Sequence, residues 1–292
     1  MARPGDTVSE LLFNALAKNR VQIKTRDMVA VSSKIVGIAE RRIRHLDSIK
    51  PGSKARTLAR KHSLTPAFAQ AVLDEADTVV GGVKGALLTL KNGDAVANAG
   101  IDRKNAPEGE VVLWPRNPDL SARNIRRSIQ RWSGKKVGVV IVDSKVSPLR
   151  LGTTGFAVGS AGFEPIEDLR GRVDLLGRRI EITLRAIADG VAASAQLVMG
   201  EASERIPFAI VRDAPVTFRS GHGIRSAKLA WDRCLYMSQI PRSSFNHKTT
   251  WIRVQRKSAS PEIRGSLEKP PKSTFASRGA TAFEIFERGP AG

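Results

Sequence analysis

Three acidic residues occupy positions from which the backbone can turn a side chain into a cleft. Asp102 follows a glycine-containing turn sequence, Asp143 follows the apolar residues 137–142, and Glu201 follows the end of a helical pattern. Functional residues are common in such loops. Two carboxylates about 4 Å apart repel each other by about 4 kcal/mol at an effective dielectric constant of about 20. A divalent cation such as Mg²⁺ or Mn²⁺ would offset this repulsion, whereas capping of turns or helices is the alternative role.

Two further segments could bind phosphate groups. Ser33 and Lys34 lie where a strand pattern passes into a helix pattern, and a helix N-terminus and a lysine both favour anions. A glycine series spans residues 152–162, and the backbone N–H groups of such loops can bind phosphate oxygens. The series matches neither the P-loop nor the dinucleotide-binding fingerprint, so tight turns and close packing explain it equally well.

The remaining residue types argue against several classes of chemistry. The four histidines are widely separated, no serine lies in a G-x-S-x-G sequence, and Cys234 is the single cysteine. These features argue against a zinc site, a serine hydrolase and an intrachain disulfide, and they predict a reducing, cytoplasmic environment. No apolar run approaches the roughly 20 residues of a membrane span, so we expect no membrane insertion.

The distribution of charge and composition divides the chain into two parts. The 48 Lys and Arg residues outnumber the 28 Asp and Glu residues, and the net charge of +20 favours partners that carry phosphates or carboxylates. Residues 241–292 are basic and rich in Pro and Ser. We predict a catalytic region over residues 1–240 and a disordered basic tail over residues 241–292, with nucleic-acid contact only through this tail.

Helix-like and strand-like patterns alternate through residues 1–240, which predicts an α+β fold. Helices are expected after a capping box of Thr7 and Glu10, over residues 32–40 and 65–76, after Ser121 as a cap, and over residues 183–199. Strands are expected at residues 28–31, 86–90, 95–97, 111–114, 136–142 and 208–211. The strand at 136–142 is expected to end at Asp143.

Six blocks of sequence occur in order between residues 3 and 240. They are VSSKIV at 31–36 with Ala39 and Glu40; NAGID at 98–102 with Asn105; Asp143 and Ser144 followed by Arg150 and Gly152; AVGSAG at 157–162; DLRG at 168–171 with Asp174, Leu175, Gly177 and Arg178; and LVMGEA at 197–202. Together these blocks resemble the coenzyme F420-0:L-glutamate ligase family, also called the F420-0 gamma-glutamyl ligases.

The resemblance implies a fold and an activity. The expected fold is a two-lobed α+β enzyme that works as a homodimer. The expected reaction joins L-glutamate to coenzyme F420-0, and then adds gamma-linked glutamate, through an acyl phosphate formed with GTP. The expected cofactors are two divalent ions, Mg²⁺ or Mn²⁺, with K⁺ as a further candidate.

The same resemblance implies roles for individual residues. Asp102 and Asp143 match ligands of the first metal ion, and Ser144 and Glu201 match ligands of the second. Asp102, Asp143 and Arg150 are the expected catalytic residues. The expected guanine-nucleotide contacts are Ser33, Lys34, Asn105, Met199, Gly200, Glu201, Ala202, Ser203, Glu204, Arg205 and Ile206.

Differences from the family, and the high net charge of the chain, leave two alternatives open. Members of the family usually carry a strand and a nucleotide-contacting loop before the point where this chain begins, and many carry a lysine where this chain has Ile38. An inactive or N-terminally truncated relative of the ligases is therefore one alternative. The net charge and the Arg-rich segment after Ser121 make a basic nucleic-acid-binding protein the other.

Overall fold

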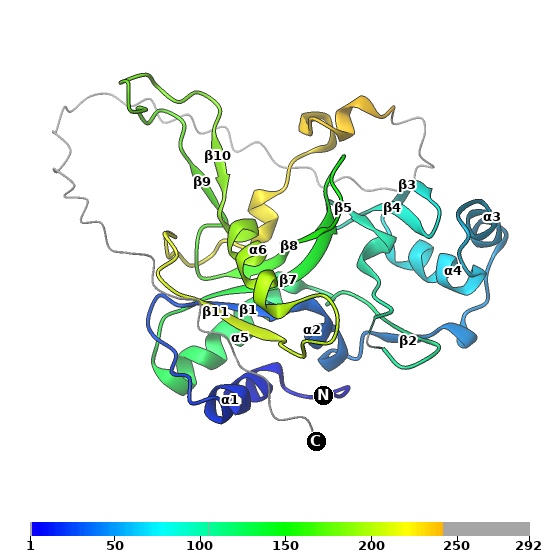
Figure 1. Ribbon diagram of the computed structural model, residues 1–292, viewed down its shortest axis with the longest axis horizontal. Coiled ribbons are helices and arrows are strands. Elements are labelled where there is room, and N and C mark those ends of the chain that lie inside the picture. The colour runs from blue at the N-terminus through cyan, green and yellow to red at the C-terminus, as the bar shows by residue number, and fades with distance from the viewer. Residues whose placement is uncertain (1, 105, 242–292) are drawn as a thin grey trace.

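The computed structural model describes residues 2–104 and 106–241 and contains a four-stranded central sheet (Figure 1). The sheet has the order β11-β1-β7-β8 and consists of β1 (Met28–Ser32), β7 (Gly138–Val146), β8 (Thr153–Ala161) and β11 (Phe208–Val211). β1 and β7 are parallel, with Ser32 opposite Val142, and β11 and β8 flank them in antiparallel pairings. The carboxyl end of β1 therefore lies beside the middle of β7, next to the position where Asp143 follows Val142.

Helices cover both faces of the central sheet. α1 (Val8–Lys18) and α5 (Pro118–Ser133) pack on the face that includes Val29 and Val139, and α6 (Ile187–Met199) packs on the face that includes Met28 and Val140. Side chains alternate between the two faces of a strand, and here both faces are buried. For this reason β1 and the first half of β7 have nearly continuous apolar sequences.

A second group of elements packs beside the central sheet. A three-stranded antiparallel sheet of β3 (Thr78–Val83), β4 (Ala86–Lys91) and β5 (Asp94–Ala97) shares an apolar core with α4 (Pro66–Glu75), against which α3 (Ser53–His62) packs. α2 (Ser33–Ala39) leads from β1 to β2 (Ile43–His45), which pairs with β6 (Glu110–Val112). The 3₁₀ turn η2 (Asn98–Gly100) follows β5 and leads to Asp102.

The remaining elements are a two-stranded sheet and short 3₁₀ turns. β9 (Ile166–Asp168) and β10 (Leu184–Ala186) form a two-stranded arm that extends away from the body (Figure 1). Four single 3₁₀ turns are η1 (Leu46–Ser48), η3 (Ile224–Ala227), η4 (Trp231–Arg233) and η5 (Met237–Gln239). No helix within the described part of the chain is both long and apolar enough to cross a membrane.

The α+β class is confirmed, since the described residues form six α-helices and several sheets. The expected helices before residue 80 and the hairpin around Asn92 and Gly93 are present, as are the strands at β1 and β11. The division into two lobes and the boundary at residue 240 stay predictions. The predicted tail lies, from residue 242 onward, outside the described residues.

Several local predictions are wrong. The Thr7 side chain makes no capping hydrogen bond to α1. Asn117 caps α5 by accepting from the Leu120 N–H, and Ser121 lies within that helix. α6 begins at Ile187, because residues 184–186 pair with β9 as a strand, and the expected strand 111–114 is the shorter β6.

The end of β7 and the glycine series also differ from expectation. β7 continues past Asp143 to Val146, because its second half pairs with β8 although it is less buried. Gly155 and Gly159 lie inside β8 rather than in a phosphate-binding loop. A side chain at Gly155 would overlap the backbone of α6, so close packing explains this glycine.

Candidate functional site

The candidate site begins where β1 and β7 run side by side. Ser33, the first residue of α2, donates its hydroxyl to Oδ2 of Asp143 at 2.9 Å. The Ser144 N–H donates to Oδ1 of the same carboxylate at 2.7 Å, and the Trp114 indole N–H donates to Oδ2. Asp143 therefore has donors on both oxygens, which fixes the orientation of its carboxylate.

The environment of Asp143 disfavours its charged form. Burial raises the pKa of Asp143 to about 6, against an ordinary value of 3.8. The hydrogen bonds from Ser144, Ser33 and Trp114 act in the opposite direction, and the negative charge of Asp102 adds to the rise. A cation that bound here would relieve this cost.

Asp102 reaches the same region from the second group of elements. Its backbone pairs with Val112 in both directions at 2.9 Å, which holds it beside β6. Its Oδ2 forms an ion pair with Lys34 Nζ at 2.8 Å, and its Oδ1 accepts from the Lys104 N–H at 2.7 Å. Lys34 also donates to the Lys104 carbonyl at 2.8 Å, so the lysine joins α2 to the loop after Asp102.

Glu201 completes the cluster from the end of α6. Gly200 ends that helix with a φ of 73°, a conformation that suits glycine, and Glu201 follows directly. The Glu201 carboxylate accepts from Gln196 at 2.7 Å and from the Ser144 hydroxyl at 3.3 Å. Lys104 Nζ lies 3.6 Å from Oε2 of Glu201. A chain of polar contacts thus links Asp143, through Ser144, Glu201 and Lys104, to Asp102.

The structure brings together most of the residues singled out in the sequence. Six belong to this cluster: Ser33, Lys34, Asp102, Asp143, Ser144 and Glu201. Arg150 lies instead in the exposed turn between β7 and β8. Asn105 lies outside the described residues.

The predicted nucleotide loop after α6 is mostly exposed. Ala202, Ser203 and Arg205 face solvent, and Ile206 is half-buried. Met199, the last residue of α6, is buried. The Glu204 carboxylate accepts from the Ala202 N–H at 2.8 Å, so this loop has local structure of its own.

Sequence reasoning missed three members of the cluster, namely Lys104, Trp114 and Gln196. Lys104 could have been found, since it is a basic residue two positions after an acidic candidate. Gln196 lies five residues before Glu201 and faces it only because Gly200 turns the chain. Nothing in the sequence around Trp114 indicates that its N–H meets Asp143.

The oxygen donors of the cluster fit Mg²⁺ or Mn²⁺ in kind, since they are carboxylates and a hydroxyl. Within the described residues no three acidic, histidine or cysteine side chains are close enough to form a metal-binding group. The ammonium groups of Lys34 and Lys104 lie against Asp102 and Glu201 and supply the balancing positive charge.

Comparison with known proteins identifies the family. The profile of the F420-0:gamma-glutamyl ligases matches residues 1–213. The chain belongs to this family. It is 38% identical over 212 residues to the coenzyme F420:L-glutamate ligase of Archaeoglobus fulgidus, covering 73% of this chain and 83% of that protein. It is 36% identical over 227 residues to the protein of the same name from Methanopyrus kandleri, covering 77% and 88%. Against that of Methanocaldococcus jannaschii the identity is 40% over 202 residues, covering 69% and 81%.

Proposed function

We propose that this F420-0:gamma-glutamyl ligase family member joins the amine of L-glutamate to the carboxyl group of coenzyme F420-0 and then adds gamma-linked glutamate, using GTP. The observation that carries the proposal is the polar cluster at the carboxyl ends of β1 and α6 and around Asp143 within β7. It gathers three acidic residues and two lysines from distant parts of a chain that belongs to this family.

The proposed reaction has two steps, because a carboxylate and an amine do not condense unaided in water. First, a carboxylate oxygen of F420-0 attacks the gamma-phosphorus of GTP, and GDP leaves with the electrons of the broken P–O bond. Second, the uncharged amine of glutamate attacks the acyl carbon, the C–O bond to the phosphate breaks, and inorganic phosphate leaves. The amine nitrogen loses a proton as the amide forms, and no atom changes its oxidation state.

The acidic residues, Ser144 and the two lysines of the cluster each have a part in the proposal. Asp102, Asp143, Ser144 and Glu201 would hold two divalent ions, which when bound supply positive charge to phosphate oxygens. Lys34 and Lys104 neutralise Asp102 and Glu201 without a ligand. With divalent ions bound to these carboxylates, the ammonium groups of Lys34 and Lys104 would be available to bind the phosphates of the nucleotide.

Other residues of the proposal lie around the cluster. Arg150 is exposed in the turn after β7, where its guanidinium can bind an anionic substrate. Ser33, Asn105 and residues 199–206 are proposed to contact GTP. K⁺ is proposed as a further ion, and comparing ligase activity in potassium and sodium buffers tests this.

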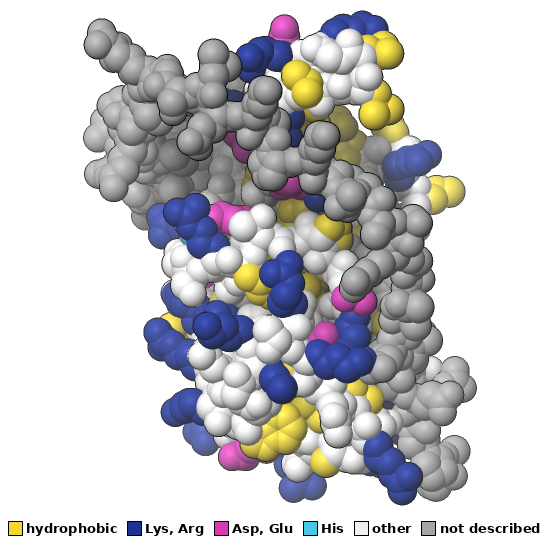
Figure 2. All heavy atoms as spheres, turned by 90° about the vertical axis from the view of Figure 1, so that its left-hand side faces the viewer, with side chains coloured by type: hydrophobic (Ala, Val, Ile, Leu, Met, Phe, Trp, Pro, Cys, Tyr) yellow, Lys and Arg dark blue, Asp and Glu magenta, His cyan; other side chains and the backbone are white. Residues whose placement is uncertain are grey.

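The surface charge supports capture of such substrates. On the face drawn in Figure 2, Lys and Arg side chains far outnumber Asp and Glu side chains. GTP, F420-0 and glutamate are all anions, and a basic surface raises their rate of encounter. The proposal places the reaction in the cytoplasm, where GTP and glutamate are available.

We also propose a homodimer, which the β9–β10 arm supports. Leu175 and Ile182 lie in this arm with exposed fractions of 104% and 86%. Apolar side chains presented on an extended arm favour burial against another protein surface. In the proposal that surface belongs to a second copy of this chain.

The test of the proposed function is direct. Purified protein is incubated with F420-0, GTP, L-glutamate and Mn²⁺, and products are followed by mass spectrometry. We expect F420 species carrying one or more glutamates, together with GDP, and no product when GTP is omitted. Absence of glutamylated product, in protein shown to be folded, would contradict the proposal and favour an inactive relative of the ligases.

A further inference from the structure

Trp114 connects the candidate site to a second, partly buried set of charged residues. Its side chain is 2% exposed and its indole N–H donates to Oδ2 of Asp143. Its backbone carbonyl accepts from Arg42 Nε at 3.0 Å. Trp114 follows β6 closely in the chain, whereas Asp143 lies in β7, so this contact joins the two groups of elements.

The indole ring is held tightly by its neighbours. The Phe156 ring of β8 lies with its centroid 6.0 Å away at an interplanar angle of 50°. The backbone of Gly100 lies so close that a Cβ there would overlap the indole, and its φ of 69° also favours glycine. The turn before Gly100 is fixed by the buried Thr89 hydroxyl, which accepts from the Ala99 N–H at 2.8 Å.

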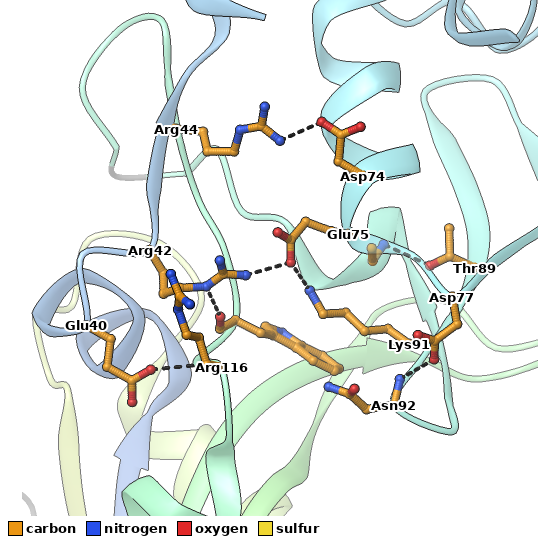
Figure 3. Close-up of polar contacts among 12 residues, drawn as sticks. Glu40, Arg42, Arg44, Asp74, Glu75, Asp77, Thr89, Lys91, Asn92 and Arg116 are labelled. Atoms are coloured by element: carbon orange, nitrogen blue, oxygen red, sulfur yellow. Dashed lines mark hydrogen bonds and ion pairs between the residues drawn. The ribbon is translucent and has the colours of Figure 1, made fainter. Parts of the chain in front are cut away.

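A partly buried ion network of Glu75, Arg42 and Lys91 lies beside the tryptophan, and Figure 3 labels its three members. Glu75, at the end of α4, accepts from Lys91 Nζ at 2.5 Å and from Arg42 Nη2 at 2.7 Å. Figure 3 shows that Arg42 and Lys91 reach Glu75 from different elements. Lys91 is 6% exposed, and its Nζ lies 5.8 Å from the centroid of the Trp114 ring.

Such a network is expected to contribute little to the free energy of unfolding. Removing charged groups from water costs several kcal/mol per ion, so a buried pair of this kind is often no better than well-packed apolar residues. The network does, however, fix the place of Arg42, whose second contact is the Trp114 carbonyl. Its geometry is therefore better suited to positioning the tryptophan.

We propose that Trp114 is a positioning residue: its indole N–H fixes the orientation of the Asp143 carboxylate, and the Arg42–Glu75–Lys91 network holds Trp114 in place. The consequence for catalysis rests on the proposed function, whereas the contact itself does not. Hydrogen-bond partners of this kind around metal-binding side chains typically account for about 10- to 100-fold in metal affinity or activity.

The variant that tests the role is Trp114→Phe, which keeps an aromatic ring and removes the N–H. Its matched control is Trp132→Phe, because Trp132 is 53% exposed and stacks on Phe13 at the end of α5. We expect kcat to fall roughly 10- to 100-fold in Trp114→Phe, with a smaller change in the KM for glutamate, and no comparable loss in the control. Equal kcat values in the two variants would overturn the proposal.

A spectroscopic measurement tests the hydrogen bond between Trp114 and Asp143 independently of enzyme activity. In a ¹H–¹⁵N spectrum of the full chain, the Trp114 indole resonance is identified by its loss in Trp114→Phe, or by selective labelling if that variant fails to fold. We expect a resonance that is shifted downfield and protected from solvent exchange, because its acceptor is a carboxylate. In Asp143→Asn the shift should move towards that of the other indoles.

Two results separate the failure of this inference from the failure of the proposed function. A Trp114 indole that exchanges as fast as that of Trp132, or that ignores the change at Asp143, would overturn the inference whatever the activity. A downfield, protected indole in a protein without ligase activity would leave the contact established and would count against the proposed function alone.

Discussion

Replacing Asp143 by asparagine should raise the free energy of unfolding above pH 6 and should lower the rate of the ligase reaction. The substitution removes a carboxylate whose pKa burial raises to about 6, while keeping the size of the side chain. Because the folded state binds the proton more tightly than the unfolded chain, the stability of the wild type falls as pH rises from about 4 to about 6. Above about pH 6 the stability of the wild type no longer changes through the ionisation of Asp143.

The size of the effect follows from the difference between the two pKa values. A pKa difference of about 2 corresponds to about 3 kcal/mol of stability lost by the wild type between pH 4 and pH 8. Asparagine carries no charge and avoids this loss. It offers one acceptor oxygen where Asp143 uses two, so it also forfeits about 1 kcal/mol of hydrogen bonding at every pH. We therefore expect the variant to be slightly less stable at pH 4 and about 2 kcal/mol more stable at pH 8.

Urea unfolding followed by circular dichroism measures this difference. Both proteins are unfolded at pH 4, 5, 6 and 8 with EDTA present, so that no divalent ion binds Asp143. Asp232→Asn, which removes an exposed carboxylate, is the matched control. A difference between Asp143→Asn and the wild type that stays constant from pH 4 to pH 8 would refute the reasoning. In the ligase assay the same variant should lose most of its turnover.

Three further comparisons test other parts of the structure. Gly155→Ala should destabilise the protein by about 1–3 kcal/mol, because the added Cβ would overlap the α6 backbone. Gly190→Ala, on the open side of that helix, should stabilise the protein by up to about 1 kcal/mol. Thermal melts compare the two variants. Lys91→Met should cost about 1–3 kcal/mol, because it leaves the partly buried Glu75 with Arg42 as its charged partner. The double change Lys91→Met with Glu75→Leu should cost less than the sum of the single changes in urea unfolding. Leu175→Asp should shift the protein from dimer towards monomer in sedimentation velocity, and an unchanged mass would count against the arm as the dimer contact.

Local patterns in the sequence predict the central elements well. β1 and the first half of β7 are found because both faces of the sheet are buried, which produces apolar runs. The sequence also places Ser33 after one strand and Asp143 at the end of the other run. It could not predict that β1 and β7 are parallel neighbours. This pairing places the Ser33 hydroxyl oxygen 2.9 Å from Oδ2 of Asp143.

The rest of the site depends on contacts between residues far apart in the chain. Lys34 and Asp102 are 68 positions apart, and their ion pair depends on the return of the chain through η2 to β6. The contact of Trp114 with Asp143 needs the close approach of Gly100, which a sequence pattern does not encode. β7 runs beyond Asp143 because β8 supplies a pairing partner, which no local apolar pattern could indicate.

The route of an oxygen atom tests the proposed ligase chemistry most directly. F420-0 labelled with ¹⁸O in its carboxyl group is incubated with the full chain, GTP, L-glutamate and Mn²⁺, and the inorganic phosphate released is examined by mass spectrometry. An acyl phosphate predicts one ¹⁸O atom transferred to phosphate for each amide formed on the labelled carboxyl group. Glutamylated product accompanied by unlabelled phosphate, or GTP consumed without any glutamylated product, would contradict the account.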